Sequence, residues 1–328
     1  MKKICVLASG GDAAGMNACI EAIFNYATQL KWGVFVSPRG YDGLVKGQVI
    51  KATRENCTNI SHITGFVFSS GRSKEFSESE GVAKAVNTVK KNGFDAVIVL
   101  GGNGSFMGAS TLKHAGVPVI AIPATIDNDV YFTCNSLGYS STCEAVVAMI
   151  DNLKGTMRSN NRNHIVQLMG RHCSDIALKT GIATFANIVD TSENRYSPEQ
   201  VAQIFKAQNK AGASSCMMIM QERKSDNAVS EAFESATFLQ QVQIAADDET
   251  IRTNTLGYLQ RGATPSCRDR YLAVNYGILA VDLVRDGTLG MAIGMVDDKF
   301  HVMDIDEANA VTVKRDKGRY EILDRIGL

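Results

Sequence analysis

The chain has 328 residues, of which 45% are hydrophobic and 21% are charged, a length and composition that suit a soluble protein with two cores. Its 34 basic and 34 acidic side chains cancel, so the net charge gives no support to a nucleic-acid or membrane partner. No stretch approaches the roughly 20 apolar residues of a membrane span. The eight cysteines are scattered without metal-site spacing, which indicates reduced thiols and a cytoplasmic protein.

Short apolar runs and amphipathic stretches alternate along the first half of the chain. The run Lys3 to Ala8 predicts a buried strand rather than a secretion signal, because Gly10-Gly11-Asp12 ends it at once. Apolar residues then recur with helical spacing from Met16 to Leu30. Further along, we expect strands at 33–36, 96–100 and 118–122 and a helix at 80–91.

The same alternation continues through the second half. The pattern predicts helices at 143–157, 198–211, 229–245 and 272–284, and strands at 165–169, 216–220 and 291–295. This order predicts an α/β fold of mainly parallel sheets with helices on both faces. In such sheets ligands gather at the carboxyl ends of the strands, so the loops after the strands are the candidate sites. No internal repeat or low-complexity linker is visible.

Glycine-rich loops follow two of the predicted strands. In the loop at 9–17 (SGGDAAGMN), glycines let backbone N–H groups approach a phosphate at the start of the following helix. The loop matches neither the dinucleotide nor the P-loop pattern, and a tight turn without a ligand is an equal alternative. The loop at 101–105 (GGNGS) has three glycines in its first four residues. A nearby phosphate or nucleotide explains that density better than a bare turn.

A third loop, at 123–129 (PATIDND), carries two carboxylates two residues apart, Asp127 and Asp129. One can accept a proton as a general base, and the other can hold a divalent cation that neutralises phosphate charge. An ordinary turn rich in Asp and Asn is the alternative.

Together, in this order and spacing, the three loops resemble the phosphofructokinase family, and the similarity extends over nearly the whole chain. Further matching runs are Arg39–Leu44, Met169–Arg171, Gln221–Glu222 and Leu259–Gly262. The resemblance implies an enzyme that transfers the γ-phosphate of ATP to O1 of fructose 6-phosphate in glycolysis, with Mg²⁺ as cofactor. It also implies two three-layer α/β lobes. Residues 1–138 plus about 260–310 would form the ATP-binding lobe, and about 139–259 plus the C-terminal tail the sugar-phosphate-binding lobe.

The resemblance also gives roles to matching positions. Asp127 would be the general base, and Asp129 would act with Asn103 on the Mg²⁺ ion. The other positions that match catalytic residues are Thr125, Arg72 and Arg171. The positions that match the ATP site are Gly11, Tyr41, Arg72, Ser73, Gly102, Gly104, Ser105 and Gly108. Those that match sugar-phosphate contacts are Thr125, Asp127, Arg162, Met169, Gly170, Arg171, Glu222, Arg252, Tyr258 and Arg261.

In the family the residues matching Arg162 and Arg252 come from a neighbouring subunit. The resemblance therefore implies a homo-oligomer, typically a tetramer, with shared active sites. Pyrophosphate-dependent relatives carry a larger residue and a lysine where this chain has Gly104 and Ala124. These two small residues favour ATP over pyrophosphate as the phosphoryl donor.

Two positions depart from the family pattern. Asn103 replaces the usual aspartate and offers a neutral oxygen to a cation, which predicts weaker metal binding or slower turnover. Tyr258 replaces the usual histidine and cannot add positive charge at the sugar's 6-phosphate. Two alternatives to fructose 6-phosphate kinase therefore stay open. One is a kinase for another sugar phosphate, such as tagatose 6-phosphate or sedoheptulose 7-phosphate, and the other is a weakly active or non-catalytic paralogue.

The positions that match the family's nucleotide effector site have lost most of their basic residues. In place of the family's basic residues and one glutamate, the chain has Glu21, Asn25, Asn187, Ala211 and Ala213, and only Arg54 fits. A site without its cations binds a polyphosphate poorly. We therefore expect weak or absent activation by ADP or GDP.

Overall fold

The computed structural model describes residues 1–222, 228–312 and 318–325, and the chain divides into two compact units. The first unit contains Met1–Ser141 and Arg261–Val313, and the second contains Thr142–Gln260 and Lys314–Leu328. In sequence, residues 142–260 of the second unit are thus inserted into the first, which the chain leaves after residue 141 and enters again at residue 261.

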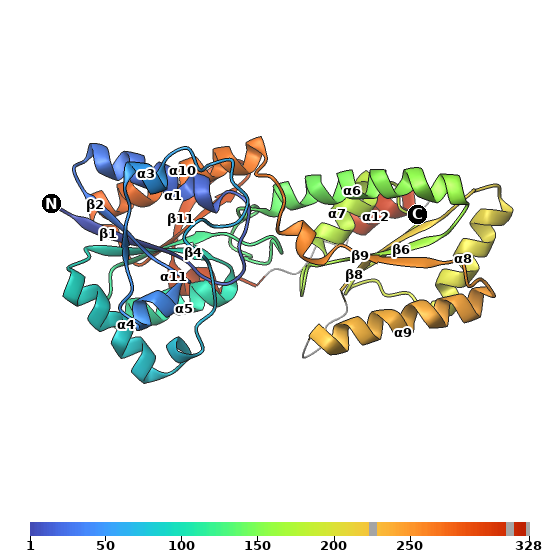
Figure 1. The fold of residues 1–328 in the computed structure, drawn as a ribbon, viewed down its shortest axis with the longest axis horizontal. Helices are drawn as coiled ribbons and strands as arrows, with labels where there is room; N and C mark the ends of the chain where they lie inside the picture. The colour runs from blue at the N-terminus through green and yellow to red at the C-terminus, as the bar shows by residue number, and fades with distance from the viewer. Residues whose placement is uncertain (223–227, 313–317, 326–328) are drawn as a thin grey trace. The chain divides into compact units, whose positions relative to one another are not determined.

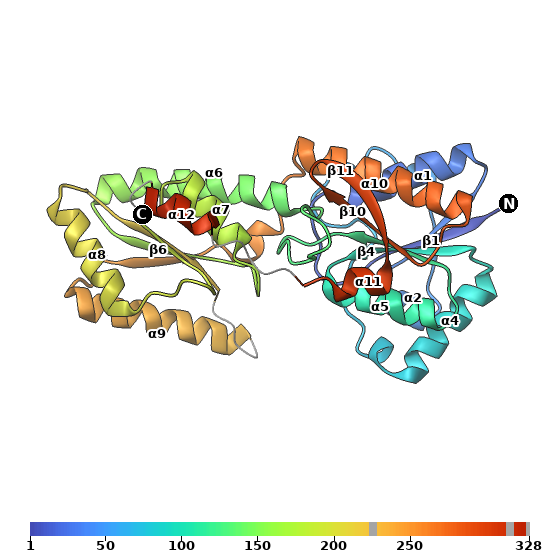
Figure 2. The same ribbon diagram turned by 180° about the vertical axis from the view of Figure 1, so that it is seen from behind.

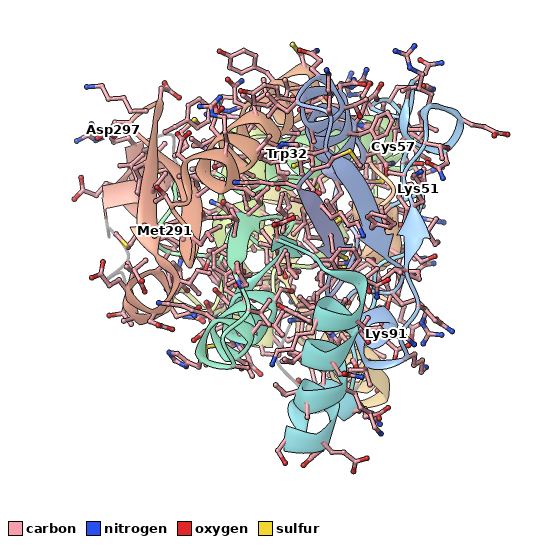
Figure 3. All side chains as sticks on the ribbon, turned by 90° about the vertical axis from the view of Figure 1, so that its left-hand side faces the viewer. Trp32, Lys51, Cys57, Lys91, Met291 and Asp297 are labelled. Atoms are coloured by element: carbon pink, nitrogen blue, oxygen red, sulfur yellow. The ribbon has the colours of Figure 1, made fainter. Side chains whose placement is uncertain are left out.

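A seven-stranded sheet forms the centre of the first unit. Its order is β11-β10-β5-β4-β1-β2-β3, and only the two edge strands, β3 and β11, are antiparallel to their neighbours. In Figure 3, Lys51 on β3 and Asp297 in the turn after β10 lie at opposite edges of this sheet. The strands are β1 (Lys3–Ala8), β2 (Gly33–Ser37), β3 (Ile50–Lys51), β4 (Ala96–Gly101), β5 (Val119–Pro123), β10 (Met291–Val296) and β11 (Lys299–Asp304).

Helices cover both faces of this sheet (Figures 1 and 2). On one face α1 (Met16–Gln29) packs along α10 (Cys267–Asp286), with the short α3 (Arg54–Cys57) beside them. The other face carries α2 (Tyr41–Val45), η1 (Glu75–Ser77), α4 (Ser79–Asn92), α5 (Asn103–His114) and α11 (Ile305–Ala310). Between the second group and the sheet lies an apolar core that includes Leu7, Val99, Phe106 and Leu112.

The second unit is built on a four-stranded parallel sheet of order β7-β8-β6-β9. Its strands are β6 (His164–Leu168), β7 (Ile188–Asp190), β8 (Met217–Gln221) and β9 (Arg252–Thr255). In Figures 1 and 2, α6 and α7 cover one face and α8 and α9 the other. The helices are α6 (Tyr139–Asn160), α7 (Asp175–Ala183), α8 (Pro198–Lys210), α9 (Ala228–Ala246) and α12 (Gly318–Arg325), with η2 (Gly257–Gln260) after β9.

The predicted fold class, an α/β protein with mainly parallel sheets and helices on both faces, is confirmed. The strands predicted from apolar runs are present, with ends that differ by at most one residue. Among the described residues, no helix is both long and apolar enough to cross a membrane.

Candidate active site

The three loops singled out in the sequence follow β1, β4 and β5, which are neighbours in the first sheet. Because the strands are parallel, all three loops leave the same edge. Backbone hydrogen bonds tie them together there. The amide of Ser9 donates to the carbonyl of Leu100 at 2.9 Å, and the amide of Ala124 donates to the carbonyl of Gly101 at 2.9 Å. The structure therefore brings the predicted phosphate-binding and acidic loops of the first unit to one place.

Two side-chain hydrogen bonds hold the glycine-rich loop after β4 in place. The Ser105 hydroxyl donates to the carbonyl of Ser9 at 3.0 Å, and the Tyr41 hydroxyl donates to the carbonyl of Ser105 at 2.7 Å. The Tyr41 ring is buried and stacks on Phe76 with 4.2 Å between ring centroids. Burial raises the pKa of Tyr41 well above its usual range. In this structure Tyr41 and Ser105, both predicted to line the ATP site, shape the loop.

The glycines of this segment lie in different surroundings. Gly104 is exposed and a Cβ added to it would meet no atom within 4 Å. A Cβ on the buried Gly108 would instead lie 2.6 Å from the Tyr41 ring, and one on Gly102 would lie 3.3 Å from the Thr125 side chain. Gly104 thus leaves open space at the surface, whereas Gly108 makes room for a core side chain.

The acidic loop after β5 is braced by its own polar groups. The Thr125 hydroxyl accepts a hydrogen bond from the amide of Asp127 at 3.2 Å, and the Ser136 hydroxyl donates to the carbonyl of Thr125 at 2.7 Å. The Asp127 side chain is buried, with 3% of its residue surface exposed, whereas Asp129 is half-buried. The two carboxylates therefore lie in different environments, as a division between a base and a cation-binding group requires.

The residues predicted to act on a metal ion fit that role unequally. Among the described residues, no group of three His, Cys, Asp or Glu side chains could hold an ion. Mg²⁺ commonly takes only one or two carboxylates and completes its shell with substrate phosphates and water, and Asp129 can supply a carboxylate of this kind. The Asn103 side chain, however, uses its amide nitrogen to donate to the backbone carbonyl of Asp129 at 2.9 Å.

Two arginines of the first unit lie beside the loop after β1. Arg72 is exposed, and the preceding Gly71 accepts a hydrogen bond from the amide of Gly10 at 3.0 Å. From the other side, Nη1 of Arg261 donates to the carbonyl of Asp12 at 3.1 Å. A Cβ on Gly11 would lie 2.5 Å from that nitrogen. Ser73, the remaining predicted ATP position, accepts a hydrogen bond from the amide of Phe76 through its hydroxyl at 3.2 Å.

In the second unit, four predicted sugar-phosphate residues meet at the carboxyl ends of β6 and β8. The Glu222 carboxylate accepts hydrogen bonds from the amides of Gly170 and Arg171 at 3.2 and 2.8 Å. The Gln221 side chain donates to the carbonyl of Arg171 at 2.9 Å. Gly170 has a φ of 146°, a conformation that L side chains rarely adopt, so the loop that carries Met169 depends on it.

The other two predicted arginines of this unit lie at the opposite edge of its sheet. Arg162 precedes β6, and Arg252 begins β9, where it pairs in register with His164. Both are exposed. Desolvation lowers the pKa of His164, and the charges of Arg252 and Arg162 lower it further. Five residues of extended chain, roughly 16 Å, separate His164 from Met169 at the other edge.

Tyr258 lies in η2 and is 82% exposed. Two supporting residues received no predicted role: Ser136, which was not noted, and Gln221, which was noted only as part of a matching run. Gln221 could have been found, because a fully buried polar residue at the end of an apolar strand must be hydrogen-bonded. Nothing in the local sequence indicates that the Ser136 side chain forms a hydrogen bond with Thr125.

At the positions that match the effector site, the acidic side chain of Glu21 binds backbone amides of its own chain. The Glu21 carboxylate on α1 accepts hydrogen bonds from the amides of Asn59, Ile60 and Ser61 at 2.6, 3.0 and 2.9 Å. An acidic side chain thus occupies backbone donors that could otherwise face an anion.

Comparisons with known proteins agree with this geometry. The family described as Phosphofructokinase matches residues 3–284. The ATP-dependent 6-phosphofructokinase of Clostridioides difficile strain 630 is 35% identical over 322 residues, which cover 98% of both chains. The enzyme of the same name from Clostridium acetobutylicum is 37% identical over 322 residues, again 98% of both chains.

Solved structures give the same result for the fold. The structure of phosphofructokinase from Saccharomyces cerevisiae superposes with a TM-score of 0.84 at 28% identity, and covers 94% of this chain but 45% of the yeast chain. The pyrophosphate-dependent phosphofructokinase from Marinobacter aquaeolei has a TM-score of 0.83 at 18% identity, over 99% of this chain and 91% of that one. At that identity the likeness concerns the fold alone.

Proposed function

The chain belongs to the phosphofructokinase family, and from this premise we propose that it transfers the γ-phosphate of ATP to O1 of fructose 6-phosphate. The observation that carries the proposal is the convergence of three loops at one sheet edge, with Asp127 buried among them. Phosphoryl transfer needs accurate positioning and stabilisation of charge more than covalent help. The loops at this end of the sheet offer backbone donors, a carboxylate and nearby arginines, which can position the substrates and stabilise their charge.

Asp127 is the general base in this proposal. It removes the proton of the sugar hydroxyl as that oxygen attacks the γ-phosphorus, and Thr125 holds both the Asp127 backbone and the substrate. Support comes from the hydrogen bond between Thr125 and the Asp127 amide, which fixes the turn. Arg72 and Arg171 stabilise the charge on the transferred phosphoryl group. When bound, Mg²⁺ supplies further neutralisation of the phosphate charge, and Asp129 is the carboxylate that fits it.

We assign ATP binding to the first unit, which contains every residue predicted for that site. The open space above Gly104 and the small side chain of Ala124 favour a nucleotide over pyrophosphate as donor. The second unit contributes most of the sugar-phosphate contacts, through Met169 to Arg171, Glu222 and Tyr258. Arg261 contributes from the first unit. Thr125 and Asp127, which the resemblance assigns to both catalysis and sugar binding, face the reacting hydroxyl in this proposal.

The proposed enzyme is a homo-oligomer, with a tetramer as the expected form. Support comes from the positions of Arg162 and Arg252 at the amino ends of β6 and β9, whereas Arg171 lies beyond the carboxyl end of β6. A neighbouring chain can provide the missing pair. The described cysteines carry no disulfide, which agrees with the cytoplasm as the site of action.

The test measures ADP release by the purified protein with ATP, Mg²⁺ and fructose 6-phosphate. Tagatose 6-phosphate and sedoheptulose 7-phosphate are compared in parallel, because Tyr258 leaves the sugar open. Asp127→Asn should reduce turnover by at least about 10²-fold while the sugar phosphate still binds. If fructose 6-phosphate binds but none of the three sugars causes ADP release from ATP, the protein is a regulatory or assembly subunit and not a kinase.

A further inference from the structure

Asn103 is the first residue of α5 and lies between Gly102 and Gly104. Its side chain reaches out of the helix to the next loop, where Nδ2 donates to the backbone carbonyl of Asp129 at 2.9 Å. The bond joins the glycine-rich loop to the residue that we propose as the Mg²⁺ carboxylate. It therefore connects two parts of the site that lie 26 positions apart in sequence.

The two ends of this bond are supported differently. At the helix, Ser105 is tied to Ser9 and to Tyr41, so the start of α5 is fixed to the sheet. In the acidic loop, the hydrogen bonds of Thr125 and Ser136 brace the first half of the turn. The Asn103 bond reaches the second half, at Asp129. It links that half of the turn to the fixed start of the helix.

The chemistry of the bond requires an amide at position 103. An asparagine side chain carries two N–H donors, whereas an ionised aspartate only accepts hydrogen bonds. An aspartate at this position would present a negative charge to a carbonyl oxygen and would sit close to the Asp129 carboxylate. Asparagine is therefore suited to this loop arrangement in a way that the family's usual aspartate is not.

We propose that Asn103 is a positioning residue for phosphoryl transfer, which fixes Asp129 against the start of α5 through the hydrogen bond to its carbonyl. This inference rests on the proposed function. It opposes the view that Asn103 is a weaker version of an aspartate ligand. If Asn103 served mainly as a cation ligand, Asn103→Asp would lower the Mg²⁺ concentration needed for half-maximal rate and would raise turnover.

The experiment compares Asn103→Asp and Asn103→Ala with wild type in kcat, in KM for ATP and fructose 6-phosphate, and in Mg²⁺ dependence. Loss of one hydrogen bond to a group that must be held in place should lower kcat about tenfold in both variants. KM for fructose 6-phosphate should stay within about twofold, since Asn103 is not among the sugar contacts. The Mg²⁺ requirement should not fall in Asn103→Asp.

Asn309→Asp provides a matched control. Asn309 on α11 donates through Nδ2 to the carbonyl of Phe106 at 3.3 Å, so the same change is made on a side chain that also bonds to α5. It lies outside the residues assigned to the site. We expect this variant to keep the kcat and Mg²⁺ dependence of wild type.

A second readout does not depend on activity. In protein without nucleotide or metal, backbone hydrogen exchange of residues 126–130 should become about tenfold faster in Asn103→Asp, and should be unchanged in Asn309→Asp. Higher kcat at lower Mg²⁺ in Asn103→Asp, or unchanged exchange in that segment, would overturn the proposal. If wild type phosphorylates no sugar, the proposed function fails, and exchange alone then decides whether the link exists.

Discussion

The shared active site can be tested by mixing two inactive variants. Arg171 lies after β6 and Arg162 before it, and the seven residue steps from Arg162 to Met169 span roughly 23 Å when extended. A hydrogen bond from an arginine to a phosphate extends only about 3 Å. We therefore expect Arg162 and Arg171 of one chain to serve different active sites. The variants Arg171→Ala and Arg162→Ala should each lose at least about 10²-fold in turnover, because each loses a guanidinium directed at phosphate.

Mixing should restore part of the activity. In a hybrid oligomer with equal amounts of the two variants, a site is complete when the Arg162→Ala chain supplies Arg171 and its neighbour supplies Arg162. With random assembly, about a quarter of the sites meet this condition. The variants are denatured together, refolded and assayed for ADP release, with each variant refolded alone as the control.

Recovery to about a quarter of the wild-type rate agrees with residues from two chains in one site. If subunit exchange is verified by mass spectrometry and the mixture stays as inactive as its components, the two arginines belong to one chain's site and the geometric argument is wrong.

Three further predictions concern the first unit. Glu21→Ala removes an acceptor of three backbone amides, so it should lower the free energy of unfolding in urea denaturation by about 2 kcal/mol. Glu55 is exposed, and Glu55→Ala should change the free energy of unfolding by less than about 0.5 kcal/mol. Equal effects of the two substitutions would contradict this prediction. Gly108→Ala forces a Cβ to within 2.6 Å of the Tyr41 ring and should cost about 1–3 kcal/mol of stability. Gly104→Ala should leave stability unchanged yet raise KM for ATP, so equal melting temperatures for the two glycine variants would refute the packing argument. Hydrogen bonds from Lys113 and Ser110 lower the pKa of Asp306 from 3.8 to about 2. The stability that this shift provides is present above the pKa of the unfolded chain and is lost as the pH falls from about 4 toward 2. The drop in melting temperature over this pH range should therefore be smaller in Lys113→Met than in wild type.

Sequence reasoning located the inner strands well because their apolar runs are short and bounded. The run before Gly101 is an example: β4 lies between two other strands, so all its side chains are buried and leave a continuous apolar signal. Edge strands give no such signal. β9, with the sequence Arg-Thr-Asn-Thr, is mostly exposed and was not predicted, and it is identified only by its pairing with β6.

Helix α5 was also not predicted, for a different reason. Its first residues are those of the glycine-rich loop, and glycine is a poor helix former. The helix nevertheless begins at Asn103, because contacts with the loop after β1, with α2 and with the acidic loop hold its first turn. These contacts join residues up to 96 positions apart, which is why the local sequence cannot reveal them.

The candidate site shows the same limit. Motif spacing indicated which residues matter, and the parallel sheet explains why their loops meet. The partners of each side chain lay beyond that reasoning. The sequence suggested that Asn103 is an impaired ligand, whereas the structure shows its amide engaged with the Asp129 backbone. Such a role depends on the direction of one side chain, which no periodicity encodes.

The discontinuous first unit has a consequence for how the protein is made. In its sheet, β10 lies beside β5, yet the ribosome produces β10 only after residues 142–260 of the second unit. At 5–20 residues per second, β5 waits for roughly eight to thirty-five seconds with an apolar edge uncovered. The four strands of the second unit are all synthesised before then. The inserted unit can therefore complete its sheet first, and the nascent first unit is the part that most needs a chaperone during translation.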